Sequence, residues 1–347
     1  MSSNSEAISP ALTVAICIGT YNQGQYIRGS IESALSQTYP VQEIWIADDG
    51  SSDETQSIVE EYCRVDPRVH YHRHATNMGP ARNLSWVLAR PSTDLVVRLD
   101  SDDRLEPEYV EVLATLMYRY PHAGYAHCDV WETDGDGNRS RLRQLARSIA
   151  YEDPEQALKS NANGLRAAAN CLLFRSTALK EANYYLAHPT WTASEDWDLA
   201  LRMILNGWGN VYSGKTLSNY RQWDDPKGVR AYRKIQEVSS NIEIFKTIVI
   251  PEFQKRGWSV APLTRFMRAK AVGFADSLDS ANFDEKDRAE YRALLKELGS
   301  SPSLSIAIFL ADYGFNPIVR KWKRLKKSLK DVAKQSLRAT MSKPART

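Results

Sequence analysis

The chain has 347 residues, 43% hydrophobic and 25% charged, so it is long enough to bury a large core. Its four cysteines are scattered and indicate neither a zinc site nor a disulfide framework. The first ten residues are polar and lack the apolar region of a signal peptide. The longest apolar stretch near the end, 306–311, is too short to cross a bilayer. We expect a cytoplasmic protein, free or peripheral on the inner face of the cytoplasmic membrane.

The formal net charge of +3 hides an asymmetry. Residues 320–347 carry 11 Lys or Arg and a single acid, Asp331, whereas the remainder is net acidic. An acidic body argues against binding to nucleic acid. Within 318–338, apolar residues recur at 4-3-4-3 spacing between the basic ones: Ile318, Trp322, Leu325, Leu329 and Val332. The pattern predicts a basic amphipathic helix suited to an anionic membrane surface, or one that packs on the domain or dimerises.

From Val14 to about Glu132, short β-branched runs alternate with stretches of helical apolar spacing. The expected strands are Val14–Ile18, Glu43–Ala47, Val69–His72 and Asp94–Leu99. The expected helices are Tyr26–Leu35, a helix capped by Ser52 or Asp53 that runs to about Tyr62, Pro80–Leu88 and Pro107–Tyr120. This order predicts an α/β fold with a doubly wound, mainly parallel sheet.

After Glu132 the regular alternation of strand and helix patterns ends. In chain order we expect a hairpin turn at 134–137, a loop with short helices at 139–169, a strand at Cys171–Phe174, a helix at Glu195–Leu205 capped by Ser194, and mostly helical structure over 230–300 with a break at Pro251. The chain therefore divides into four expected parts: a flexible arm at 1–12, an α/β domain at 13–225, a helical extension at 226–300, and a basic amphipathic helix and tail at 301–347.

Polar clusters directly follow three of the predicted strands. They are Thr20-Tyr21-Asn22, Asp48-Asp49 and Asp100-Ser101-Asp102-Asp103. Because ligands bind beyond the carboxyl ends of the strands in such sheets, we expect the three clusters to meet at one edge. Carboxylates as close as those of Asp100, Asp102 and Asp103 repel one another unless a cation neutralises them. A divalent ion that bridges carboxylates and substrate phosphates would do so, although a solvated acidic turn is the plainer alternative.

Three further side chains at this edge fit a nucleotide. Asp49 could accept hydrogen bonds from a ribose or a base, and Tyr21 could stack on a flat heterocycle. Arg82, in the first turn of the helix at 80–88, could pair with phosphate. Each has a structural alternative as well, namely a helix cap, a simple turn and a surface arginine.

Glu195 and Asp196 stand at the start of a predicted helix, where the helix dipole favours carboxylates. Their functional interpretation makes Asp196 a general base beside an apolar wall formed by Trp197. His70, His72 and His74 alternate along one strand and share a face, but no further metal ligands are apparent near them.

Together these motifs resemble glycosyltransferase family 2 over about residues 13–225, and the bacterial surface-glycan type in particular. The segments that carry the resemblance are Val14–Asn22, Ser33–Pro40, Ile44–Ser52, Asn77–Asn83, Val96–Pro107, Leu172–Ala178 and Ser194–Met203. The resemblance implies a GT-A fold with a nucleotide-binding edge, and an inverting, metal-dependent nucleotide-sugar transferase.

The resemblance also implies roles for individual residues. Donor-nucleotide contacts fall on Thr20, Tyr21, Asn22, Asp49, Arg82 and Asp100. Asp102, with Asp103, would hold Mg²⁺ or Mn²⁺, and Asp196 would deprotonate the acceptor. Glu195, Trp197 and Asn170 would support the acceptor or its loop. Trp223 stands where many relatives have a metal-contacting His, so the ligand shell is expected to be thinner.

The implied reaction is a single displacement from a nucleoside-diphosphate sugar, UDP-sugar first, to a hydroxyl of a glycan or lipid-linked acceptor. Surface polysaccharide biosynthesis is the expected setting. The alternative is a catalytically idle nucleotide-sugar-binding or scaffold module on the same fold. A nucleotidyltransferase is less well matched, because 19–24 is a poor phosphate loop.

Overall fold

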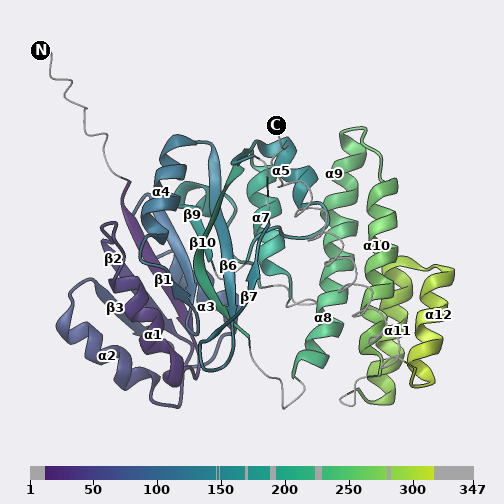
Figure 1. The fold of residues 1–347 in the computed structure, drawn as a ribbon, viewed down its shortest axis with the longest axis horizontal. Helices are drawn as coiled ribbons and strands as arrows, with labels where there is room; N and C mark the ends of the chain where they lie inside the picture. The colour runs from purple at the N-terminus through teal and green to yellow at the C-terminus, as the bar shows by residue number, and fades with distance from the viewer. Residues whose placement is uncertain are drawn as a thin grey trace, which may run out of the picture. The chain divides into compact units, whose positions relative to one another are not determined.

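The computed structural model describes residues 12–145, 147, 149–168, 171–187, 193–222, 229–279 and 283–315. The chain divides into two compact units, Met1–Asp224 and Asp225–Thr347. The first unit is an α/β domain built on one mixed sheet, and the second is helical (Figure 1).

The sheet of the first unit has ten strands among the described residues, in the order β3-β2-β1-β4-β9-β6-β10-β5, with β7 on β6 and β8 on β10. Their bounds are β1 Val14–Thr20, β2 Glu43–Asp48, β3 Val69–Arg73, β4 Leu95–Asp100, β5 Arg104–Leu105, β6 Ala123–Thr133, β7 Arg139–Arg143, β8 Tyr151–Glu152, β9 Cys171–Arg175 and β10 Gly209–Arg221. The first four strands pair in parallel, as their buried apolar runs predict.

The second half of the sheet is where the sequence prediction falls short. β9 runs antiparallel between β4 and β6, and β10 pairs in parallel with β6. Neither β6 nor β10 was expected, because polar residues interrupt their apolar pattern and register shifts break β10 near Ser213 and Thr216. The α/β fold class and the hairpin turn at 134–137 are confirmed, and 139–169 contains two short strands and a helix.

Helices cover both faces of the sheet (Figure 1). One face packs against α1 Gly24–Leu35, α2 Thr55–Val65 and α4 Tyr109–Arg119. The other packs against α3 Pro80–Leu88, α6 Ser176–Glu181 and α7 Glu195–Leu205, with α5 Pro154–Asn161 against α7 and β10. Alternate residues of β4 therefore enter two cores: Leu95, Val97 and Leu99 on the first face, and Val96 on the second.

Two predicted helix caps are wrong. Helix α2 begins at Thr55 without a side-chain cap, and the Asp53 carboxylate instead accepts the backbone N–H groups of Gly24 at 2.9 Å and Thr55 at 3.1 Å. Ser194 does precede α7, but its side chain caps nothing, and its φ of +71° places it in the left-handed region. Its carbonyl accepts the N–H groups of Trp197 and Asp198, so the turn itself starts the helix.

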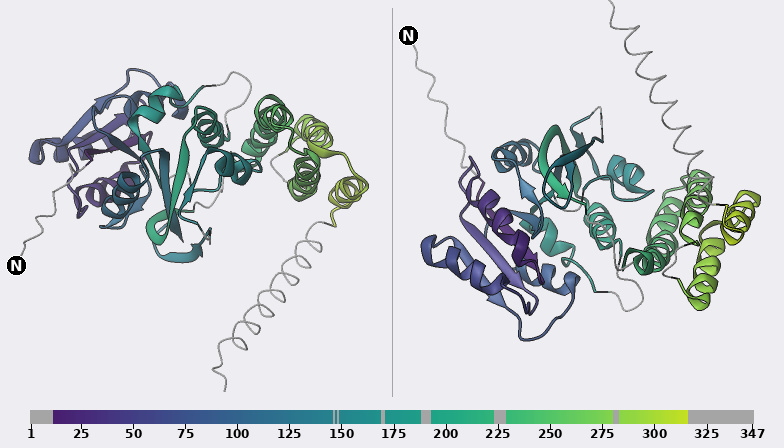
Figure 2. Two further views of the ribbon diagram at one scale, coloured as in Figure 1. Left: turned by 90° about the horizontal axis from the view of Figure 1, so that it is seen from above. Right: turned by 60° about the horizontal axis from the view of Figure 1, so that its bottom comes forward.

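The second unit contains α8 Val229–Ile244, α9 Ile250–Lys255, α10 Ala261–Phe274, α11 Glu285–Gly299 and α12 Pro302–Asp312. Helix α11 packs against α8 and α10, and Figure 2 shows these helices in green to yellow. The predicted break at Pro251 appears as a π-helical turn, Phe245–Val249, followed by α9 with Pro251 in its first turn. Among the described helices, none is both long and apolar enough to cross a membrane.

Two valines of α2 provide a matched test of the first core. Val59 is fully buried against it, whereas Val65, six residues later on the same helix, is 78% exposed. We expect Val59→Ala to lower the free energy of unfolding by about 2 kcal/mol through lost burial and a residual cavity. Val65→Ala should stay within about 0.5 kcal/mol of wild type. Urea unfolding of the full chain, followed by tryptophan fluorescence, measures both; equal effects would contradict the assigned packing.

Candidate active site

The two aspartates at the end of β2 brace the surrounding loops. Asp48 is fully buried and accepts hydrogen bonds from the backbone N–H of Ser51 at 2.8 Å and the hydroxyl of Tyr71 at 2.6 Å. Asp49 is also buried, and its two oxygens accept the N–H groups of Met78 at 2.7 Å and Gly79 at 2.9 Å. Asp49 therefore fixes the loop that leads into α3, a contact that the sequence did not predict.

The segment after β1 presents one exposed aromatic ring. Asn22 adopts a left-handed backbone with φ +52°, its N–H donates to the Ser51 hydroxyl at 2.8 Å, and its Oδ1 accepts the N–H of Ser52 at 2.8 Å. Thr20 is buried, and its hydroxyl has no hydrogen-bond partner in the described part of the chain. Between them Tyr21 is 48% exposed, so its ring is available to a ligand at this edge.

Arg82 lies on the exposed side of the first turn of α3, as expected. The next residue, Asn83, is buried and donates its amide N–H to the carbonyl of Ala47 at 2.9 Å. This bond ties the start of α3 to the end of β2. The loop held by Asp49 and the helix that carries Arg82 are therefore fixed to the same strand end.

The aspartate cluster occupies the turn between β4 and β5. Asp103 is buried and accepts the backbone N–H of Arg221, at the end of β10, at 2.7 Å. The Arg221 guanidinium in turn donates to the carbonyl of Asp102 at 2.9 Å and lies over the Tyr26 ring. Burial raises the pKa of Tyr220, and the nearby charges of Asp103, Asp100 and Asp102 raise it further. Asp103 thus braces the turn, while Asp102 is only partly buried.

Arg98 is the main feature that the sequence analysis missed. It is the one charged residue among the five buried positions of β4, which ends at the partly buried Asp100, and it is only 8% exposed. Its guanidinium donates to Asp100 Oδ1 at 3.0 Å, to the Tyr185 hydroxyl at 2.9 Å and to Asp196 Oδ1. The Tyr185 hydroxyl also donates to Asp196 Oδ1, at 2.7 Å. The guanidinium therefore joins the predicted ribose contact, Asp100, to the predicted base, Asp196.

This arrangement shifts the pKa values of both hydrogen-bond donors to Asp196. Burial alone would lower the pKa of Arg98, but the adjacent Asp100 and Asp196 raise it well above its ordinary value. Burial raises the pKa of Tyr185 well above its usual range, and the charge of Asp196 adds to that effect. Arg98 therefore stays charged and Tyr185 stays protonated, so both donate hydrogen bonds to Asp196.

The neighbours of Asp196 differ in their surroundings. Trp197 is buried, and its indole N–H donates to the carbonyl of Asn161 at 2.7 Å, which anchors α7 to α5. Glu195 is partly buried at the start of the helix. Asn170, the third residue expected to support the acceptor, lies outside the described residues, as do Trp223 and the segment 318–338.

A divalent metal at this edge would need oxygens of the substrate phosphates as well as protein carboxylates. Among the described residues, no group of three or more His, Cys, Asp or Glu side chains could hold a metal ion. Asp100 is engaged by Arg98, and Asp103 by the backbone of Arg221. Mg²⁺ is often bound by one or two carboxylates together with substrate phosphates, and Asp102 suits that arrangement. Whether Asp103 contributes as a ligand stays a prediction.

His70 and His72 of β3, and His74 directly after it, pack against aromatic rings. His70 stacks on Trp45 with ring centroids 4.6 Å apart, and His72 stacks on Trp86 at 4.3 Å. His74 Nε2 lies 3.1 Å from the Asn83 amide oxygen. These contacts give the histidines a structural role.

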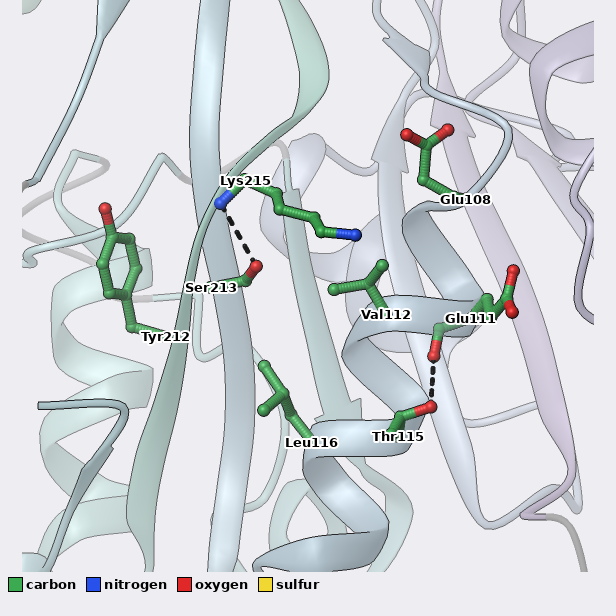
Figure 3. Close-up of a pocket in the computed structure, with 8 residues that line it drawn as sticks. All are labelled: Glu108, Glu111, Val112, Thr115, Leu116, Tyr212, Ser213 and Lys215. Carbon is green, nitrogen blue, oxygen red and sulfur yellow. Dashed lines mark hydrogen bonds between the residues drawn. The ribbon is translucent and has the colours of Figure 1, made fainter.

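Two surface hollows lie elsewhere on the first unit. The larger, of about 500 Å³, lies between α4 and β10 and is shown in Figure 3. Val112 and Leu116 give it apolar lining, the Lys215 side chain extends toward Val112, and Glu108 also lines it. The smaller, of about 380 Å³, is lined by Asp129, Arg147 and Tyr212 among others. Neither hollow is lined by the aspartate cluster or by Asp196.

Residues 15–181 match the family described as Glycosyl transferase family 2. The strand edge with its aspartate cluster lies within this region, which is a family 2 glycosyltransferase domain. A curated relative, chondroitin synthase of Escherichia coli, is 41% identical over 100 residues, which cover 28% of this chain and 14% of the relative. The chain spans between 28% and 55% of the length of three further curated glycosyltransferases.

Two solved structures share the GT-A fold. The mannosyltransferase PcManGT from Pyrobaculum calidifontis, in complex with GDP-Man and Mn²⁺, has a TM-score of 0.55 at 16% identity and covers 94% of this chain and 87% of that one. S. aureus TarS 1-349, in complex with UDP-GlcNAc, has a TM-score of 0.54 at 19% identity and covers 83% and 71%. At these identities the likeness concerns the fold.

The bracing role of Asp49 can be tested by amide exchange. Asp49→Asn removes one of the two oxygens that accept backbone N–H groups, so we expect faster hydrogen exchange at Met78 and Gly79, by roughly tenfold or more if about 1.4 kcal/mol of local stability is lost. Asp53→Asn is the matched control, because its carboxylate accepts from Gly24 and Thr55 instead. Unchanged exchange at Met78 and Gly79 in Asp49→Asn would contradict the contact.

Proposed function

We propose that this chain is an inverting glycosyltransferase that moves a sugar from a nucleoside-diphosphate donor to a hydroxyl acceptor. The observation that carries the proposal is the link between Asp100 and Asp196 through Arg98. It brings a donor-side carboxylate and a candidate base to the same strand end. The edge also carries the exposed ring of Tyr21 and the guanidinium of Arg82, which suit a base and a phosphate.

The residues would act in one displacement. The acceptor oxygen attacks the anomeric carbon as the bond from that carbon to the phosphate oxygen breaks, and the nucleoside diphosphate leaves with the electron pair. Asp196 takes the acceptor proton, a contribution of roughly 10²–10⁴-fold in rate. Asp102, with the donor diphosphate and with Asp103 as the second expected ligand, would hold Mg²⁺ or Mn²⁺. When bound, such a cation neutralises charge on the leaving group.

The comparisons support a narrower choice of donor and setting. A UDP-sugar is the favoured donor, in line with the UDP-GlcNAc complex of TarS, and the GDP-Man and Mn²⁺ of PcManGT support a metal-assisted reaction. The chondroitin synthase relative supports a glycan or lipid-linked acceptor in surface polysaccharide biosynthesis. Glu195 and Asn170 are proposed to support the acceptor or its loop, and Trp197 holds the helix that carries Asp196.

Asp196→Asn tests the proposed base. With UDP-glucose, UDP-N-acetylglucosamine, UDP-galactose and UDP-glucuronate as donors and Mn²⁺ present, UDP release by the full chain should fall by about 10²-fold or more in the variant. Binding of UDP with Mn²⁺, measured by calorimetry, should stay within about threefold, since Asp196 acts on the acceptor side. Asp279→Asn, on the second unit, is the control with wild-type turnover.

The same assay separates the enzyme from an idle module. Wild-type protein that binds UDP but releases none from any donor, with or without Mn²⁺, would favour a nucleotide-sugar-binding or scaffold function. Wild-type turnover that survives Asp196→Asn would remove the base assignment. Loss of turnover on addition of a chelator is the result expected for metal dependence.

A peripheral position on the inner face of the cytoplasmic membrane is a second part of the proposal. Helix α12 and the residue that ends it expose apolar side chains: Ile306 is 61% exposed, Phe309 54% and the C-cap residue Tyr313 67%. The sequence that follows, 318–338, is rich in Lys and Arg. Apolar insertion together with basic attraction is the combination by which amphipathic segments bind anionic lipid.

Vesicle binding tests the membrane proposal. The full chain should co-sediment with phosphatidylglycerol vesicles far more than with phosphatidylcholine vesicles, and less as salt rises. Phe309→Ser and Lys326→Glu/Lys327→Glu should each weaken binding several-fold, because each removes one of the two attractions. Tyr118→Ser, which removes an aromatic ring 53% exposed on α4, is the control. Equal sedimentation with both lipids would contradict the idea.

A further inference from the structure

We infer that Arg98 is a positioning residue, which with Tyr185 holds one oxygen of Asp196 and leaves the other for the acceptor. The inference rests on the proposed function and adds two residues to it. Arg98 comes from β4, Tyr185 from the segment after α6, and Asp196 from the first turn of α7. Three separate parts of the chain therefore converge on one carboxylate.

Arg98 is placed too deep in the fold to be a surface arginine. Its neighbours Val97 and Leu99 are fully buried on the opposite face of the sheet, and its own side chain is 10% exposed. A guanidinium out of water needs anionic partners, and Asp100 and Asp196 supply them. Because both partners share one cation, the guanidinium also reduces the repulsion between two carboxylates that lie close together.

The two oxygens of Asp196 differ in their surroundings. Oδ1 accepts from the Arg98 guanidinium and from the Tyr185 hydroxyl. In the described part of the chain, Oδ2 has no hydrogen-bond partner, and the side chain is 22% exposed. Holding Oδ1 fixes the carboxylate plane, so Oδ2 keeps one direction toward the acceptor hydroxyl. Such orientation contributes to rate because the reacting groups no longer have to be aligned at each encounter.

Tyr185 is itself held from the other side. It is 4% exposed, and its carbonyl accepts the Ser85 hydroxyl of α3 at 2.5 Å. The Arg98 guanidinium lies 5.3 Å from the centre of its ring. Tyr185 is therefore a rigid donor, and Tyr185→Phe removes one hydrogen bond to Asp196 while keeping the ring.

The test is a double-mutant cycle on full-length protein, with UDP release from the four UDP-sugars and Mn²⁺ as the assay. Arg98→Met should lower kcat by about 10²-fold while binding of UDP with Mn²⁺ changes less than about threefold. Arg98→Lys should recover part of kcat, because an ammonium keeps the charge but not the fork that reaches both carboxylates. Tyr185→Phe should lower kcat by about tenfold.

The double variant tests whether the loss of kcat in Arg98→Met arises through Asp196. If Arg98 acts through Asp196, Arg98→Met/Asp196→Asn should be no slower than Asp196→Asn alone. Fully multiplicative losses would overturn the inference. So would an Arg98→Met protein with a kcat within threefold of wild type.

A matched control distinguishes a general packing defect from the loss of the positioning role of Arg98. Arg175→Met removes a half-buried arginine of the adjacent strand β9, whose guanidinium donates to the carbonyls of Ala123 and Met117. It should lower the unfolding temperature but leave kcat near wild type when assayed well below that temperature. If Arg175→Met and Arg98→Met lose kcat equally, the role of Arg98 is only structural. A normal rate in Asp196→Asn would instead remove the proposed base, a failure distinct from that of Arg98.

Discussion

A buried guanidinium shared by two carboxylates is the interaction on which the candidate site depends. The Arg98 guanidinium forms ion pairs with Asp100 and with Asp196, and this shared positive charge favours the ionised form of both carboxylates. With it, the end of β4 and the start of α7 are held together. The side chain that carries this charge also sets the position of the proposed base relative to the donor side.

The other aspartates of the edge mainly serve its architecture. Asp48 accepts the N–H of Ser51 in the loop that follows it, Asp49 accepts that of Met78 ahead of α3, and Asp103 accepts that of Arg221 at the end of β10. Such charge-assisted bonds fix loops that would otherwise move. The second oxygen of Asp196, by contrast, accepts no hydrogen bond in the described part of the chain. The site therefore contains many aspartates, but three of them, Asp48, Asp49 and Asp103, are buried.

The parallel half of the fold could be predicted because its signal is local. The apolar runs of β1 to β4 and the polar residues after them give both the strands and the edge on which the clusters meet. The antiparallel insertion of β9 and the strands β6 and β10 depend on long-range pairing that no local pattern encodes. For the same reason Arg98 was missed: its partners Tyr185 and Asp196 lie 87 and 98 residues away. A lone arginine within an apolar strand was the available signal.

A crystal structure of the full chain with UDP and Mn²⁺ tests this account most directly. We expect Arg98 to stay within hydrogen-bond distance of both Asp100 and Asp196, Mn²⁺ to be held by Asp102 with the diphosphate, and Asp196 Oδ2 to face open space beside the donor. An Arg98 side chain turned away from Asp196, or an Asp196 carboxylate with both oxygens engaged by protein groups, would contradict it.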